Sequence, residues 1–205
     1  MNFNFDLYEK SEAKEMGERE VLELGGHELV IMDAREYTGL TGNVSLKICV
    51  DIAGNDKQKG FFKRQYDNNN LSERKWPNGA TKYLSLKDEQ ISYLKGFITS
   101  LEKSNNNFKF NTKGTWEQLK GLKIAGQFGL EEYEKQDGTV ATTTKLIQFR
   151  SLDKLNEIQI PRVKKLDGSY VDYDKYQTTK NQNNNADLES LFASSPEINE
   201  EDMPF

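Results

Sequence analysis

Residues 44–52 read VSLKICVDI, and this stretch determines the fold class that the sequence predicts. Apolar side chains fill every second position from Val44 to Ile52, and polar residues or the single cysteine fill the positions between them. Strict alternation of this kind is typical of a β-strand with one buried face and one polar face. The chain is therefore expected to be built around a sheet.

Strand and helix signals on either side extend this sheet. Residues 27–38 predict a partner strand, joined to residues 44–53 by the turn GLTGN. FFKRQYD at 61–67 is expected to form a third strand, and residues 86–103 a helix that opens on a capping box of Ser85 and Asp88. After a helical turn at 115–118, residues 122–134 and 139–150 read as two strands joined by KQDG.

The predicted order is three strands, a helix and two strands. This favours a mainly β protein with an OB-fold-like, five-stranded Greek-key barrel and one helix between strands 3 and 4. The expected divisions are an acidic lead-in at 1–24, the barrel at 25–157, an extended arm at 158–180 and a disordered acidic tail at 181–205. The tail holds six acids and no Lys or Arg, with too few apolar residues to offset its ordering entropy.

Composition excludes several classes of function. One cysteine, Cys49, allows no internal disulfide and is read as a packed thiol, and one histidine, His27, is read as a turn residue. We therefore expect no metal, no cofactor and no enzymatic activity. The absence of a long apolar window and of a signal-peptide pattern predicts a cytoplasmic protein without membrane contact.

Charge is distributed unevenly. Residues 57–113 carry twelve Lys or Arg against five acids, and aromatic residues interleave with these cations. Cations meet phosphates and flat rings stack on unpaired bases, so the pattern indicates binding of single-stranded nucleic acid. The candidate DNA-binding residues are Lys47, Lys59, Phe61, Phe62, Lys63, Arg64, Tyr66, Arg74, Lys75, Trp76, Lys82 and Lys123. Because Phe61 and Phe62 are adjacent, a strand would bury at least one of them.

The chain ends in Glu200, Glu201, Asp202, Met203, Pro204 and Phe205. A terminal Phe offers a ring and a carboxylate that an apolar pocket with a basic rim can capture. This ending resembles the acidic tip of bacterial single-stranded DNA-binding proteins, with Met203 in place of the more usual Ile. The body is similar to the divergent members of that family that bacteriophages encode.

The resemblance implies an OB-fold that coats single strands without strong sequence preference during replication, recombination and repair. It also implies a tip that recruits partner enzymes and, in that family, can compete with DNA for the basic groove. A homo-oligomer is compatible with the sequence. A strand-annealing recombination protein and a metal-dependent nuclease remain alternatives, although the acids Asp33, Glu36 and Asp51 are too scattered to assign to a metal.

Overall fold

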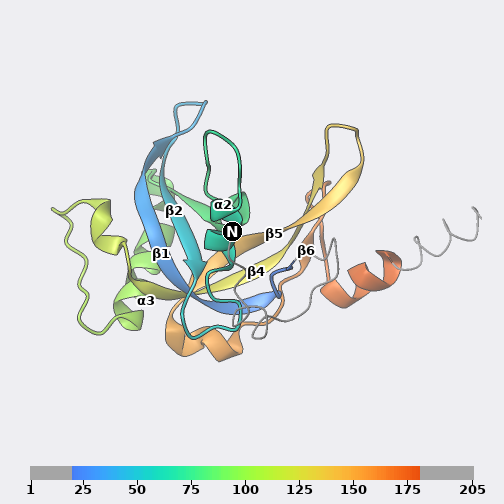
Figure 1. The fold of residues 1–205 in the computed structure, drawn as a ribbon. Helices are drawn as coiled ribbons and strands as arrows, with labels where there is room; N and C mark the ends of the chain where they lie inside the picture. Colours follow the sequence, from blue (N-terminus) through green and yellow to red (C-terminus); the bar gives the residue numbers. More distant parts are fainter. Residues whose placement is uncertain (1–19, 181–205) are drawn as a thin grey trace, which may run out of the picture.

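The computed structural model describes residues 20–180 of the protein (Figure 1). It is mainly β. The strands are β1 (Gly25–Thr38), β2 (Val44–Ile52), β3 (Thr81–Ser85), β4 (Lys123–Glu134), β5 (Val140–Arg150), β6 (Val163–Lys164) and β7 (Tyr170–Val171). The helical elements are α2 (Phe61–Asp67), η1 (Asn78–Ala80), η2 (Asp88–Gln90), α3 (Ile91–Ser104), η3 (Trp116–Leu119) and η4 (Leu152–Glu157). Residues 173–180 are also helical.

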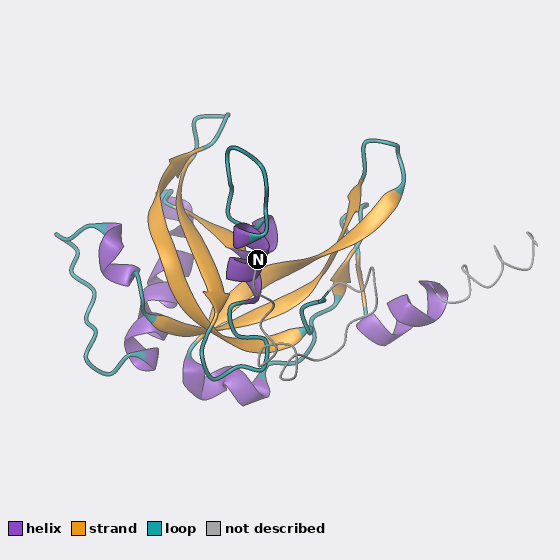
Figure 2. Ribbon diagram, in the orientation of Figure 1, coloured by secondary structure: helices purple, strands orange, loops and turns teal. Residues whose placement is uncertain are grey.

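The seven strands form one mixed sheet. Its hydrogen-bonded order is β3-β2-β1-β4-β6-β7, and β5 pairs with β4 outside this path. All pairings are antiparallel except the short parallel contact between β4 and β6. The sheet curls strongly, with α3 beside the first strands and the 173–180 helix beyond the β4–β5 hairpin (Figure 2).

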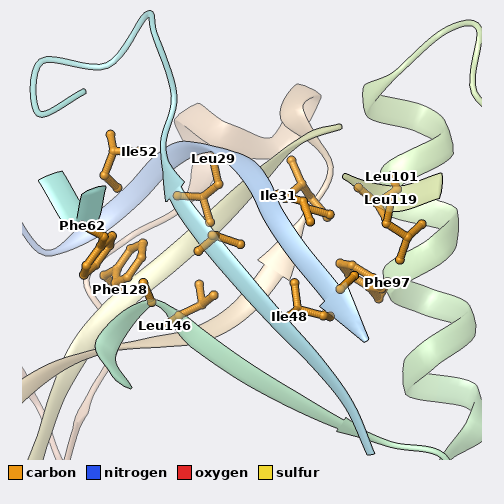
Figure 3. Close-up of a cluster of buried hydrophobic side chains, with 14 of the residues drawn as sticks. Leu29, Ile31, Ile48, Ile52, Phe62, Phe97, Leu101, Leu119, Phe128 and Leu146 are labelled. Carbon is orange, nitrogen blue, oxygen red and sulfur yellow. The ribbon is translucent and has the colours of Figure 1, made fainter. Parts of the chain in front are cut away.

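The alternation predicted for residues 44–52 is present only in the first part of β2, and from Cys49 to Ile52 both faces of the strand are buried. Leu46, Ile48 and Val50 are fully buried, and β1 contributes Leu29 and Ile31 to the same cluster (Figure 3). From the other elements, the core receives Phe62, Phe97, Leu101, Leu119, Phe128 and Leu146. Leu22 is also buried, so the core extends into the predicted lead-in.

The prediction of a third strand at residues 61–67 is wrong, because this segment forms α2. The carboxylate of Asp51, buried at the end of β2, accepts hydrogen bonds from the backbone N–H groups of Phe62 (3.0 Å) and Lys63 (3.3 Å). A distant strand residue thereby satisfies the first N–H groups of the helix, which otherwise have no partner. The residues next to α2 in sequence therefore gave no sign that this helix is capped.

The third strand is β3, which pairs with β2. Within residues 20–180 no backbone ladder joins β3 to β5, so the expected closed barrel is not formed. The two strands meet instead along a seam. At one end of the seam, Gly79 lies so close to β5 that a Cβ there would stand 2.6 Å from the Thr144 carbonyl oxygen. Further along, Lys82 Nζ donates to the Ile147 carbonyl oxygen at 2.7 Å.

The helix predicted at 86–103 is present, but α3 begins later, at Ile91. The predicted capping box is not formed, because Ser85 Oγ accepts the Lys87 N–H at 3.3 Å and no side chain caps the helix. Helix α3 ends at Ser104, one residue beyond the predicted end. Asn105, the next residue, hydrogen-bonds both the last turn and the backbone of Lys123, which fixes α3 against β4.

The strands predicted at 122–134 and 139–150 are confirmed as β4 and β5. The segment after η4 lies on the outer face of β4, where a Cβ at Gly129 would stand 2.4 Å from Pro161 Cγ. The predicted arm thus adds β6 and β7 to the sheet. No helix within residues 20–180 is long and apolar enough to cross a membrane.

Candidate functional site

The α2 segment, residues 59–76, contains most of the candidate DNA-binding residues. Two of them, Phe61 and Phe62, are buried, with exposed fractions of 5% and 3%, and the Phe62 ring stacks on Phe128. Neither ring can stack on a base without leaving the core. Their burial argues against direct contact with DNA. A helix can direct two adjacent rings into one core, whereas a strand would place them on opposite faces.

The cations of α2 have acidic partners. Lys63 Nζ lies 2.8 Å from Asp67, one turn further along the helix. Arg64 binds both carboxylate oxygens of Glu20, at 2.8 and 2.9 Å, and also donates to the Lys59 carbonyl oxygen. These exposed pairs contribute little stability, but they offset the positive charge that phosphate binding would need. The net positive charge at the surface of α2 is thus smaller than the number of Lys and Arg residues in its sequence suggests.

Trp76 lies in the loop between α2 and η1, and its side chain is held against the body of the protein. The indole N–H of Trp76 donates to the Val50 carbonyl oxygen at 2.9 Å, and its ring lies against Tyr66, with centroids 5.4 Å apart. Both rings are half-buried. Arg74 and Lys75 in this loop are exposed, as is Lys59 before the helix.

A groove of about 650 Å³ crosses the seam between β3 and β5. We call it the seam groove. Its lining comes from five parts of the chain that are distant in sequence. The residues that line it are Asn78, Thr81, Lys82, Tyr83, Gln127, Glu131, Lys145, Leu146, Ile147, Gln148, Pro161, Arg162, Lys164 and Tyr170.

In the described part of the chain, four cations and one carboxylate, that of Glu131, line the seam groove. Glu131 binds Lys145 at 2.8 Å and Lys164 at 2.5 Å, and these two hydrogen bonds lower its pKa. The same carboxylate raises the pKa of Lys164. Together with Arg162 and Lys82, the groove keeps a net positive charge of +3. It is a suitable surface for a polyanion.

Lys82 occupies the seam itself. Its ammonium group donates to the Ile147 carbonyl oxygen, and burial lowers its pKa, while the nearby Glu131 opposes that shift. A lysine on this edge can turn its ammonium outward to a phosphate, because its long chain is flexible. Of the predicted DNA-binding residues, Lys82 alone lines the seam groove.

Exposed tyrosines border the groove. Tyr83 and Tyr37 lie with ring centroids 5.3 Å apart, each 43% exposed, and Lys47 Nζ stands 5.9 Å above the Tyr37 ring. Arg162 and Tyr170 also line the groove, and the guanidinium of Arg162 lies 5.6 Å from the centre of the exposed Tyr170 ring. The groove thus combines cations with accessible rings, the composition predicted for the α2 segment.

Of the remaining predicted residues, Lys123 lies apart from this groove. Lys123 forms an ion pair of 2.7 Å with Glu28 beside β1. The tip residues 200–205 lie outside the described residues. Sequence reasoning missed Tyr37, Tyr83, Arg162 and Tyr170. Tyr83 directly follows Lys82 and Arg162 lies two residues before Lys164, but nothing in the sequence indicates that these segments meet at one surface. In β5, Lys145 directly precedes the buried Leu146, so strand alternation directs Lys145 to the opposite, polar face. That alternation is a signal from which the exposure of Lys145 could have been predicted.

Cys49 and His27 have structural roles. Burial raises the pKa of the Cys49 thiol, which contacts the Thr81 hydroxyl at 3.9 Å. His27 is buried rather than at a surface turn, and its ring nitrogens lie 2.9 Å from Asp56 and from the Glu23 carbonyl oxygen. Among residues 20–180, no three His, Cys, Asp or Glu side chains gather as a metal site would require.

Comparisons with protein-family models and with curated protein sequences found no match for this chain.

Proposed function

We propose that the protein binds single-stranded DNA in the seam groove and coats it without strong sequence preference. The observation that carries this proposal is the groove itself, where Lys82, Lys145, Arg162 and Lys164 converge with exposed tyrosines. Lysine and arginine attract phosphates, and tyrosine faces accept any base. A base held inside a duplex cannot offer its face in this way, so the rings favour single strands.

The strand pairing supports an OB-like interpretation of the sheet. Strands β1, β2 and β3 form a meander, β1 also pairs with β4, β4 pairs with β5, and α3 lies between β3 and β4 in the chain. OB-folds are often only partly closed and bind oligonucleotides on strands 2 and 3 and on the loops after strands 1 and 4. The corresponding loops, 39–43 and 135–139, project to the same side of the molecule (Figure 1).

A second part of the proposal concerns the tip, residues 200–205. We infer that its acidic residues and terminal Phe recruit replication, recombination or repair proteins to the coated strand. Support for this part comes from the sequence, through the resemblance in Glu200 to Phe205 and the capture chemistry of a terminal ring and carboxylate.

Fluorescence anisotropy with labelled single and double strands tests the DNA-binding proposal on the full chain. We expect tighter binding to the single strand and an affinity that falls steeply with salt. Two double variants locate the contact. Lys82→Ala/Arg162→Ala should reduce the slope of log K against log [salt] by about 1.4, since each phosphate contact to a single strand contributes about 0.7, and within residues 20–180 neither cation forms an ion pair.

The matched control is Lys63→Ala/Arg64→Ala, which removes the same charge from α2. We expect it to change the slope little, because acids already offset both cations. Equal and weak binding of the wild type to both DNA forms would contradict the proposed function. A larger slope change in the control than in the groove variant would move the site to α2.

A further inference from the structure

A second hollow adjoins the seam groove on the side of α3. Its volume is about 590 Å³, and it lies between β3, α3 and β5. It shares Lys82, Tyr83, Ile147 and Gln148 with the seam groove. A strand lying in the groove can therefore reach the hollow without leaving the surface. We call it the α3 hollow.

The floor of the α3 hollow is apolar and aromatic. Phe97 of α3 and Phe149 of β5 contribute to its lining, with ring centroids 4.8 Å apart. At the rim, Tyr93 is 73% exposed, the most exposed aromatic ring in the described chain, and Tyr83 stands at the boundary with the groove. A flat apolar ring would find stacking partners here.

Gly96 lines the α3 hollow. It lies in the interior of α3, on an exposed face, and a Cβ built on it meets no atom within 4 Å. Glycine is the poorest helix former after proline, so an exposed helix position with free space would ordinarily carry another residue. The space that glycine leaves here is part of the hollow itself.

The charge of the lining indicates the kind of ligand. Of the residues at positions 20–180 that line it, Lys82 and Arg150 are charged and none is Asp or Glu. The lining also contains polar side chains that can hydrogen-bond to the edge of a base, namely those of Gln90, Ser92, Ser100 and Gln148. An apolar floor with a cationic and polar rim matches a nucleotide, which combines a flat base with a phosphate.

We propose that the α3 hollow is a nucleobase subsite that extends the seam groove. One base of the bound strand enters the hollow beside Tyr93 and above the Phe97–Phe149 pair, and Arg150 meets a neighbouring phosphate. This inference rests on the proposed function and adds a contact outside the strands and loops that OB-folds ordinarily use. An apolar side chain of a partner protein is the competing occupant, and the experiment separates the two.

Gly96→Leu tests the subsite, because leucine fills the hollow from α3 while strengthening the helix. Thr99→Leu is the matched control, since Thr99 is exposed on the same helix and does not line the hollow. Anisotropy is measured on the full chain with oligo-dT of about 4 to 16 nucleotides, the range of OB site sizes. We expect Gly96→Leu to weaken binding of the longer strands about tenfold, or about 1.4 kcal/mol, and Thr99→Leu to leave it unchanged.

Thermal unfolding of both variants checks that each remains folded. A second measurement is photocrosslinking of 5-iododeoxyuridine oligonucleotides, for which we expect adducts at Tyr93 in the wild type and their loss in Gly96→Leu. If the wild type binds DNA and Gly96→Leu binds it equally well without losing the adducts, the subsite is absent, whether or not a protein uses the hollow. If the wild type binds no single strand, the proposed function fails first.

Discussion

The α2 segment and the seam groove carry similar residues and use them differently. In the α2 segment, cations and aromatics are concentrated within eighteen positions of sequence, from residue 59 to residue 76. There Phe61 and Phe62 belong to the core, and Lys63 and Arg64 have acidic partners. In the seam groove, similar side chains come from separate parts of the chain and remain accessible to solvent.

The difference teaches that local composition predicts the kind of binding chemistry better than it predicts where on the molecule the binding surface lies. A cluster of rings in sequence is a good candidate for core, because burying aromatic area is among the largest stabilising terms available to a domain. A binding surface requires rings that the core leaves exposed, and the fold determines which ones these are. Three experiments can test this contrast, and they are given from the largest expected effect to the smallest.

The largest effect is expected for Phe62→Ala. Removing a ring that is 3% exposed and stacked on Phe128 should lower the free energy of unfolding by about 3 to 5 kcal/mol. Urea unfolding measures this change. Under conditions where the variant is still folded, its affinity for single-stranded DNA should match that of the wild type. Normal stability with lost binding would show that Phe62 is a ligand rather than core.

An intermediate effect is expected from a pair of aromatic variants. Tyr83→Ala should weaken DNA binding by about 1 to 3 kcal/mol, the usual value of one stacked base, and change stability little. Trp76→Ala should lower the stability and change DNA binding little, because the indole N–H of Trp76 donates to the Val50 carbonyl oxygen and its ring packs on Tyr66. Fluorescence anisotropy measures the DNA affinity of both variants, and thermal unfolding measures their stability. Weakened binding in Trp76→Ala alone would return the site to the α2 segment.

The smallest effect is expected for Glu131→Gln, which removes the carboxylate that lies among the described residues of the seam groove. At neutral pH it should tighten DNA binding a few-fold, because Lys145 and Lys164 lose their acidic partner. Its cost in stability should be below about 1 kcal/mol. Looser binding by this variant would mean that the carboxylate positions the lysines for the strand instead of competing with it.

The same variant has a defined pH dependence. The folded pKa of Glu131 lies below its ordinary 4.5, so the carboxylate stabilises the wild type above about pH 4.5, and this contribution is lost as the pH falls through the folded value. The difference in unfolding free energy between wild type and Glu131→Gln should therefore shrink in acid. A difference that grows below pH 4.5 would contradict the ion pairs.

Much of the fold was predictable from short-range pattern. The alternation in β1, β2, β4 and β5 and the helical spacing in α3 are direct consequences of side-chain direction in strands and helices. The segment that became α2 was not predictable, since seven residues with two apolar neighbours fit a strand or a helix equally well. Its assignment depends on Asp51, ten residues upstream of its first residue, which caps it across the fold.

The sequence by itself determined a β-rich body with one long helix and a chemistry of cations with aromatic rings. Periodicity and composition are local properties, and they persist whatever the rest of the chain does. Only the tertiary structure decided that β3 and β5 meet at an open seam and that Lys82, Lys145 and Arg162 gather there. Long-range packing determines which side chains are buried or paired and which stay available to a ligand, and no short stretch of sequence contains that information.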